Sequence, residues 1–262
     1  PLWVVSLPFL LLGQPLGLTL GGLATAIIYL AIPAAAVFAY LAAGRLTTSW
    51  VARTVLATLW IVAPPFLDAL HTGQIGAVVA HTLLPLAVSC VMAAWRGSAP
   101  AFGLAALTFG ALASAAPVYL GVACVLALIG VAFNKGRRKR WLWLPVPALM
   151  FLAPTLRTYS DPYLVFSQAG VPTGSESARA MIDAIAGDMW SWIPLAVVVA
   201  VATLALLRIH RMWWIRAGWL VAAFGIVHAT ASQYANVATR SVAGGYETIE
   251  ASPHIGLSIG WF

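Results

Sequence analysis

Asp68 and His71 lie three residues apart in the stretch FLDALHTGQIG (66–76), in an otherwise apolar part of the chain. A carboxylate at the end of a broken helix can act as a general base toward a hydroxyl group or coordinate a divalent cation. An imidazole one turn away can share that task. The same spacing also suits a solvated turn, or an Asp–His pair that closes the turn before Gly73. We keep both interpretations, and treat Asp68 and His71 as candidate catalytic residues.

Two further histidines, His81 and His228, lie inside apolar runs. An imidazole in such a place can hydrogen-bond a carbonyl freed by a proline, such as Pro85, or a carbonyl of a neighbouring helix. This structural role is the favoured prediction for both. The alternative is proton handling or substrate contact, because ionisable groups within a membrane are candidates for function. On that alternative His81 is a candidate binding residue.

Basic and mixed-charge clusters supply the remaining candidates. The run NKGRRKR (134–140) could bind anionic lipid head groups or the pyrophosphate of a lipid carrier through Arg137, Arg138, Lys139 and Arg140. A simple role in setting membrane orientation explains the same run. A second set combines arginine, carboxylate and aromatic groups that suit a sugar or phospho-sugar, although ordinary loop composition explains it equally. That set is Arg157, Tyr159, Asp161, Arg240 and Glu247.

Local motifs for well-known chemistries are largely missing. GLSIG (256–260) matches the GxSxG pattern of serine hydrolases, but that motif needs a strand–turn–helix context and here it begins an apolar run. We therefore predict no nucleophile at Ser258. The sequence contains no P-loop, HExxH, paired CxxC or dinucleotide fingerprint. Cys90 and Cys124 lie in apolar segments and indicate buried thiols, so no metal site is predicted from motifs.

Composition determines what must surround these residues. The chain is 62% hydrophobic and 8% charged, with a mean hydropathy of +0.93, whereas soluble domains are about half apolar and a quarter charged. So few charges cannot cover a water-exposed surface, which predicts an integral membrane protein with no nucleic-acid partner. Because irregular backbone is excluded from lipid, the apolar runs should be helices, which predicts an all-α transmembrane bundle.

Apolar runs predict about ten membrane segments with proline-broken helices. The run 101–133 would measure about 50 Å as one helix, too long for a membrane core of about 30 Å, so we expect it to split at Pro117 into a hairpin. The other expected segments are 1–12, 18–43, 54–67, 75–95, 141–156, 189–207, 217–230 and 255 onward.

Charge indicates the orientation of this bundle. Cytoplasmic loops carry an excess of Lys and Arg, and the hairpin split places eleven of the fourteen basic residues inside and all seven acidic residues outside. The protein is therefore predicted to be a multi-pass membrane protein whose Lys- and Arg-rich loops face the cytoplasm. The loops 157–188 and 231–254 should be extracytoplasmic, with a short amphipathic helix at 175–190.

The chain begins at Pro1 and ends at Phe262 within an apolar run. We therefore expect residues 1–262 to form a single transmembrane domain that belongs to a longer polypeptide. Four stretches match a family pattern in order along the chain: DALHTGQIGAVVAHTLLPLAV (68–88), APTL (153–156), SQAGVP (167–172) and SPHIGLSIG (252–260). Together they resemble the membrane region of large actinobacterial family 2 glycosyltransferases.

In that family a cytoplasmic nucleotide-sugar transferase domain precedes a multi-helix membrane region. The early half of this chain also resembles the membrane scaffold of polyprenyl-phosphate-sugar-dependent transferases, which use an acidic residue of an outer loop in catalysis. The resemblance implies envelope glycan synthesis with membrane lipid, a lipid-linked sugar and a soluble transferase domain or partner protein. The sequence carries no DxD metal signature. A divalent cation is one candidate cofactor, and the sequence identifies no other.

Two alternatives remain beside a transferase. The first is a carrier or flippase for a lipid-linked glycan, for which internal repeats and ionisable residues near the bilayer midplane are typical; the sequence shows no repeat. The second is a non-catalytic membrane scaffold, which would tolerate neutralisation of Asp68 where a transferase would not.

Overall fold

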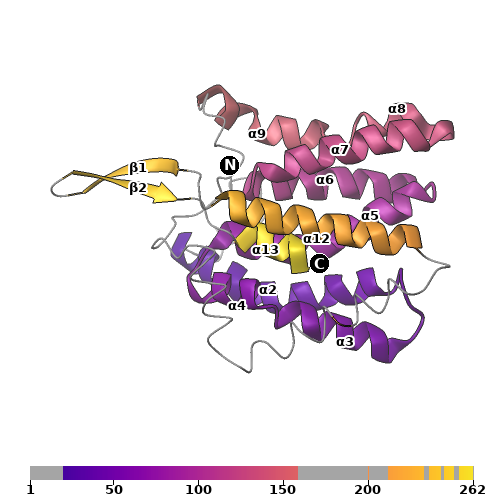
Figure 1. The fold of residues 1–262 in the computed structure, drawn as a ribbon, viewed down its shortest axis with the longest axis horizontal. Coiled ribbons are helices and arrows are strands. Elements are labelled where there is room, and N and C mark those ends of the chain that lie inside the picture. Colours follow the sequence, from indigo (N-terminus) through magenta and orange to yellow (C-terminus); the bar gives the residue numbers. More distant parts are fainter. Residues whose placement is uncertain are drawn as a thin grey trace.

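The computed structural model describes residues 20–158, 200, 212–232, 236–242, 245–250 and 254–261. In this part the chain is helical apart from one β-hairpin (Figure 1). In chain order the elements are α2 (Leu20–Ala43), α3 (Trp50–Ile61), α4 (Pro64–His71), α5 (Ile75–Trp95), α6 (Ala99–Ala115), α7 (Val118–Phe133), the 3-10 helix η2 (Lys135–Arg137), α8 (Arg138–Trp141), α9 (Val146–Thr158), α12 (Met212–Ser232), β1 (Asn236–Val242), β2 (Gly245–Glu250) and α13 (His254–Trp261).

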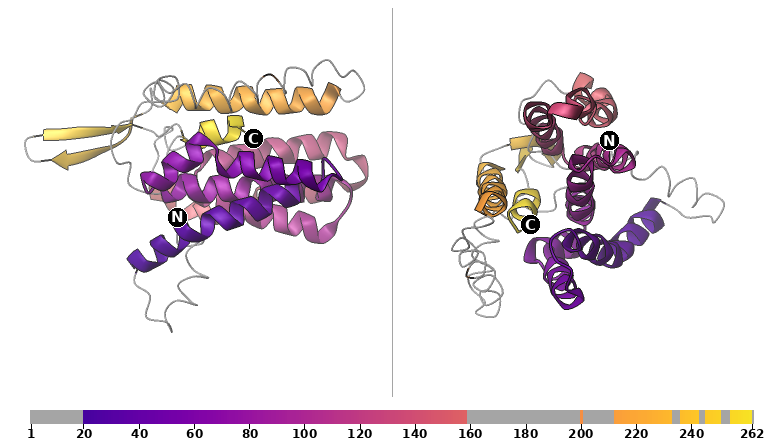
Figure 2. Two further views of the ribbon diagram at one scale, coloured as in Figure 1. Left: turned by 90° about the horizontal axis from the view of Figure 1, so that it is seen from below. Right: turned by 90° about the vertical axis from the view of Figure 1, so that its right-hand side faces the viewer.

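Helix α5 lies at the centre of the described bundle. It packs against α2 on one side and α6 on another, and it also contacts α4 and α13 (Figure 2). Its side chains are mostly buried, whereas only about a fifth of those of α2 are buried. The exposed residues of α2 include Tyr29, Leu30, Val37 and Leu41. An apolar outer surface of this kind is expected where lipid is the solvent.

The helix pair α3 and α4 bends by 45° at a short break. Ser49 caps the start of α3, and its side chain accepts a hydrogen bond from the Ala52 amide at 3.4 Å. Pro64 and Pro65 follow the break, and neither can donate a backbone hydrogen bond to the preceding turn. The predicted run 54–67 is therefore two helices with a bend rather than one continuous segment.

The predicted split of residues 101–133 is confirmed. Helix α6 ends at Ala115 and α7 begins at Val118, on either side of Pro117. The ends of the two helices that are far from Pro117, Ala99 of α6 and Phe133 of α7, lie at the same end of the bundle. There the Asn134 side-chain amide donates to the Trp95 carbonyl at 3.4 Å, and Arg140 donates to the Ser98 carbonyl at 2.8 Å.

Helices α12 and α13 cross at glycines. A Cβ atom added at Gly225 would lie 2.3 Å from the backbone nitrogen of Gly260, and one added at Gly256 would lie 2.5 Å from that of Ala229. No side chain fits at either position without a backbone shift. Small residues at helix crossings allow this kind of close approach, and here they hold α13 against α12.

The structure contains fewer full-length spans than the ten segments expected from sequence. In the described residues two helices, Ala24–Ala43 and Ile75–Trp95, are long and apolar enough to cross a membrane, and the bent pair α3–α4 makes a third if it counts as one span. The apolar helices Ala99–Ala115, Val118–Phe133 and Trp219–Ser232 are shorter. Seventeen helical residues rise only about 26 Å, against a membrane core of about 30 Å. Proline breaks shorten α3 and α6 in this way.

The predicted loop 231–254 contains an antiparallel hairpin instead of irregular chain. Its strands pair from Val242 opposite Gly245 back to Asn236 opposite Glu250, with an irregularity between Asn236 and Ala238. The all-α prediction omitted this hairpin because neither strand is apolar enough to stand out beside the helices. The expected segments 1–12 and 189–207 and the amphipathic helix at 175–190 fall outside the described residues, except for residue 200.

Candidate functional site

Asp68 pairs with a histidine from the far end of the chain. The Nε2 atom of His254, at the start of α13, forms a hydrogen bond with Oδ2 of Asp68, in the middle of α4. The side chain of His254 is 3% exposed and that of Asp68 is 31% exposed. The imidazole is thus fixed inside the bundle, and the carboxylate reaches the surface.

This arrangement can orient a base. An ionised carboxylate only accepts hydrogen bonds, so His254 donates its Nε2–H to Asp68. The bond fixes one carboxylate oxygen in place. Because part of the side chain remains exposed, a hydroxyl group arriving from outside can reach the carboxylate. The pair is therefore chemically suited to accept a proton from a bound alcohol.

A second polar cluster lies deeper, around His81 of α5. Its Nε2 is 3.0 Å from the Trp60 carbonyl oxygen, and its Nδ1 is 3.0 Å from the Ser258 hydroxyl. The imidazole ring is stacked between Trp60 and Phe66, at centroid distances of 4.0 and 4.4 Å. His81 is completely buried.

The partners of His81 define its hydrogen-bonding pattern. The Trp60 carbonyl can only accept, so Nε2 of a neutral imidazole donates to it, and Nδ1 then accepts from the Ser258 hydroxyl. In a continuous helix the residue at position 64 would donate to this carbonyl, and Pro64 cannot. His81 supplies a donor at the bend between α3 and α4. The predicted bond to a carbonyl of a neighbouring helix is confirmed, with the relevant proline being Pro64 rather than Pro85.

One helix serves both clusters. His254 and Ser258 are four residues apart on α13, so they project from the same face, one turn from each other. That face meets α4 and α5, while Gly256 meets α12 behind it. Our sequence reasoning missed His254 and dismissed Ser258. A usable signal was present, since histidine and serine repeat at one four-residue spacing and Gly256 and Gly260 repeat at another.

The other candidate residues from the sequence lie in different parts of the structure. His71 is exposed at the end of α4, and the histidine that bonds Asp68 is His254. Arg240 and Glu247 face each other as Cα partners in the β1–β2 hairpin. Arg157 lies in the last turn of α9, and Tyr159 and Asp161 fall outside the described residues.

The basic candidates lie at the other end of the bundle. Arg137 ends η2, and Arg138, Lys139 and Arg140 begin α8. The guanidinium of Arg140 sits over the Phe102 ring, 4.6 Å from its centroid. That of Arg137 lies next to Gly97 of the α5–α6 turn. These contacts join two basic turns into one surface.

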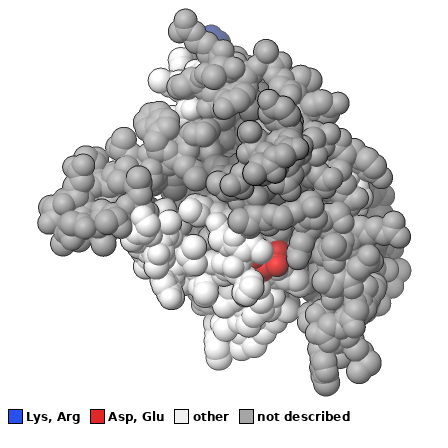
Figure 3. All heavy atoms as spheres, turned by 90° about the vertical axis from the view of Figure 1, so that its left-hand side faces the viewer, with Lys and Arg blue, Asp and Glu red and all other residues white. Residues whose placement is uncertain are grey.

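The two ends are well separated. Asp68 precedes α5 and Arg96 follows it, so the 21 residues of this helix place them about 32 Å apart. The turns α2–α3, α5–α6 and α7–α8 lie on the right of Figure 1, and α4 and the hairpin lie on the left. Seen from that left side, the described acidic atoms form one spot at the edge of an uncharged area (Figure 3). Asp68 is the only acidic residue between positions 20 and 158.

Within the described ranges, no group of three or more His, Cys, Asp or Glu side chains is placed to hold a metal ion. The geometry of the pair formed by Asp68 and His254, rather than a likeness to another protein, is thus what bears on function. Comparison of the chain with known families, curated proteins and solved structures finds no match to any of the three.

Proposed function

We propose that this chain is the membrane-embedded part of a bacterial envelope glycosyltransferase that uses a polyprenyl-phosphate-linked sugar. Asp68 acts as the general base, and His254 positions it. The observation that carries this proposal is a partly exposed carboxylate held by a buried imidazole, at the end of the bundle away from the basic turns. The motifs in 68–88 and 252–260, which carry the family resemblance, contain both residues.

The reaction assigns each group one task. Asp68 accepts the proton of an acceptor hydroxyl as its oxygen attacks the anomeric carbon of the sugar. The bond from that carbon to the phosphate oxygen breaks, and polyprenyl phosphate leaves with the electron pair. His254 holds the carboxylate in the orientation that the attack requires. His71, exposed one turn from Asp68, is our candidate for contact with the acceptor.

The proposal includes a multi-pass position in the plasma membrane with the basic turns in the cytoplasm. It is supported by the apolar exterior of α2 and α7, by two helices of spanning length and by the separation of the basic turns from α4, the helix that carries Asp68 (Figure 1). An excess of Lys and Arg on one side is the usual sign of the cytoplasmic face. The active site then opens extracytoplasmically, where polyprenyl-phosphate sugars are used.

A transfer assay on the full-length protein tests the function. Membranes containing the protein are incubated with radiolabelled polyprenyl-phosphate mannose, glucose or arabinose, and the label entering glycan or glycolipid is measured. Asp68→Asn keeps the size of the side chain and removes the base, so product formation should fall by at least about 100-fold. His254→Gln should lower it less, by about 10-fold, because the carboxylate remains.

Glu250→Gln provides the matched control, since it neutralises an acidic residue of the hairpin outside the proposed site. Its activity should stay within about twofold of the wild type. All variants are compared at equal abundance in the membrane, with melting temperatures measured in detergent. Wild-type turnover by Asp68→Asn at equal abundance contradicts the proposal and favours a scaffold, for which the loss of this carboxylate is harmless.

A further inference from the structure

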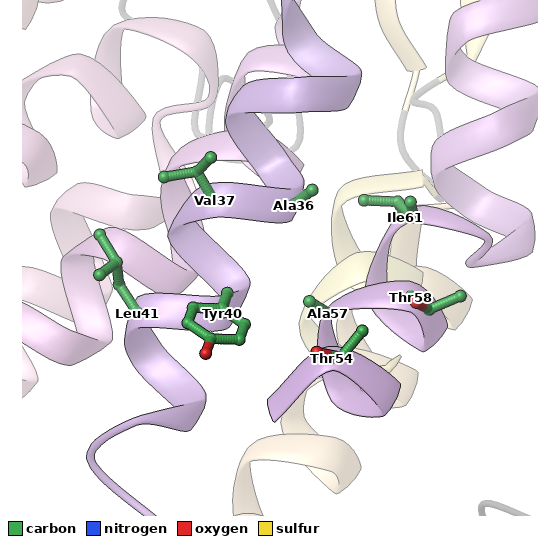
Figure 4. A pocket seen from close by; sticks show the side chains of 8 residues that line it. All are labelled: Ala36, Val37, Tyr40, Leu41, Thr54, Ala57, Thr58 and Ile61. Carbon is green, nitrogen blue, oxygen red and sulfur yellow. The ribbon is translucent and has the colours of Figure 1, made fainter. Parts of the chain in front are cut away.

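Helices α2 and α3 enclose an apolar groove on the side of the bundle. It has a volume of about 310 Å³, at the lower end of the range of about 300–1,000 Å³ for small-molecule sites. Val37, Tyr40 and Leu41 line it from α2, and Thr54, Ala57 and Ile61 line it from α3 (Figure 4). The groove is open to the outside, because Leu41 and Val37 are each 54% exposed.

The lining is almost entirely hydrocarbon. Its hydroxyl groups come from Tyr40, Thr54 and Thr58, and Thr54 already donates to the Trp50 carbonyl at 3.0 Å. A surface of this composition repels water and accepts an alkyl chain. The groove runs between two helices that face outward, so a chain lying in it can enter sideways from a surrounding bilayer.

A fixed arginine stands at one end of this groove. Arg53 donates from Nε to the Thr47 carbonyl at 2.9 Å, and its guanidinium lies over the Tyr40 ring, 5.9 Å from the centroid. Among the described residues its terminal Nη nitrogens form no hydrogen bond or ion pair. A planar guanidinium held in this way is ready to bind a phosphate through two parallel hydrogen bonds.

The surrounding turn adds positive potential at the same place. Arg45 lies exposed in the α2–α3 turn, and α3 begins there, so the positive end of its helix dipole points to the same spot. Asp68 is the only acidic residue in positions 20–158, and α4, the helix that carries it, lies at the opposite end of the bundle. An anion near Arg53 therefore meets two guanidinium groups and no described carboxylate.

The exposed side chains of the turn fit a membrane interface. Trp50 is 71% exposed and Leu46 is 63% exposed. Tryptophan is enriched where the hydrocarbon core meets the head groups, because its ring is apolar and its N–H group is polar. This turn thus places Arg53 at the depth of lipid phosphates, and the groove extends from there toward the hydrocarbon core.

We propose that the α2–α3 groove binds one anionic phospholipid, with an acyl chain between Val37 and Ala57 and the phosphate on Arg53 and Arg45. The inference rests on the membrane insertion that is part of the proposed function, and it does not depend on transferase activity. A helix of a partner protein could fill the hydrocarbon part but would leave the arginines without an anion. The positive charge of Arg53 and Arg45 at the end of the groove is what favours a phospholipid.

Native mass spectrometry of the full-length protein tests this binding. The protein is purified in detergent, supplied with equal amounts of phosphatidylglycerol and phosphatidylcholine, and the retained lipid is counted. The wild type should retain phosphatidylglycerol at least fivefold better than phosphatidylcholine. Arg53→Gln should abolish this preference, and Arg53→Lys should restore part of it. Thr58→Phe, at an exposed position of the lining, should fill the groove and reduce retention of both lipids.

Arg96→Gln is the matched control, because it removes one positive charge from a different turn at the same end of the bundle. It should keep the preference of the wild type. The proposal is overturned if Arg53→Gln and Thr58→Phe retain lipid as the wild type does, or if Arg96→Gln causes an equal loss. Inorganic phosphate added in excess should not displace the lipid, since the acyl chain contributes to binding. Asp68→Asn should still bind phosphatidylglycerol, which separates failure of this site from failure of the proposed chemistry.

Discussion

The two ends of the bundle are built in different ways. The basic end consists of short turns, in which Arg53 contacts Thr47 of its own turn and Arg140 contacts Ser98 of the adjacent α5–α6 turn. The acidic end joins Asp68 of α4 to His254 of α13, 186 positions away. The contacts of the basic turns do not depend on α13, whereas Asp68 and His254 can pair only while α13 packs against α4.

This difference predicts which substitutions affect a single turn and which affect the whole site. A change at the α12–α13 crossing should disturb the acidic end without touching any residue that contacts Asp68 or His81. A change in a basic turn should reach no further than the basic turns that it contacts. The three predictions below test this contrast with melting temperatures and transferase activity of the full-length protein.

The largest effect is expected from Gly256→Ala. The new methyl group would meet backbone atoms of Ala229 at 2.5 and 2.8 Å, which cannot rotate away. Overpacking of this kind lowers the free energy of unfolding by about 1–3 kcal/mol. Because α13 should no longer pack closely against α12, activity should fall together with the melting temperature. Gly260→Ala is the control, since its nearest contact would be an ordinary 3.5 Å. Equal behaviour of the two variants would refute the tight crossing.

An intermediate effect is expected from His81→Phe. Phenylalanine keeps the stack on Trp60 and Phe66 but removes both hydrogen bonds of His81. The buried Ser258 hydroxyl then loses its imidazole partner, while the Trp60 carbonyl still accepts from the Ala63 amide at 3.3 Å. A buried polar group without its partner costs about 1–3 kcal/mol, which should appear as a lower melting temperature. Ser258→Ala removes only one of the two bonds and should cost less, about 0.5–1.5 kcal/mol. If Ser258→Ala were the more damaging change, our account of His81 as the central member would be wrong.

The smallest effect is expected at the turn glycine Gly73, which we compare with Gly97, a turn glycine at the other end of the bundle. Gly97 has φ +111° and Gly73 has φ +70°. Gly97→Ala forces a side chain into a backbone region that costs about 1–2 kcal/mol, and it must also displace the Arg137 guanidinium. Gly73→Asn should cost only a few tenths of a kcal/mol, because asparagine tolerates the left-handed region and no atom lies within 4 Å. Melting curves that rank them in the opposite order would contradict this.

Much of the local structure followed from the sequence. Pro117 and the length of the 101–133 run predicted the α6–α7 break, because both are properties of one short segment. The separation of Arg45, Arg96 and Arg137–Arg140 from Asp68 followed from the same split. Helix lengths were predicted less well. Apolar runs were counted as spans, although prolines and turns end several helices before they reach the thickness of a membrane.

The site itself was only half predictable. Asp68 stood out because acidic residues are rare in this chain, and His81 because it lies in an apolar run. The choice of His254 over His71 as the partner of Asp68 depends on how α13 docks, and no local spacing encodes that. Proximity in sequence made His71 the natural candidate, and tertiary packing brought a different imidazole to the carboxylate.

The placement of His254 and Ser258 on consecutive turns of α13 has a mechanical consequence. Each residue along an α-helix is rotated by about 100° from the previous one, so a slip of α13 by a single position would turn both side chains away from their partners simultaneously. Such a slip would therefore break the hydrogen bond from His254 to Asp68 and the one between Ser258 and His81 together. Any signal that displaced this eight-residue helix would act on the carboxylate and on the α3–α4 bend in a single step.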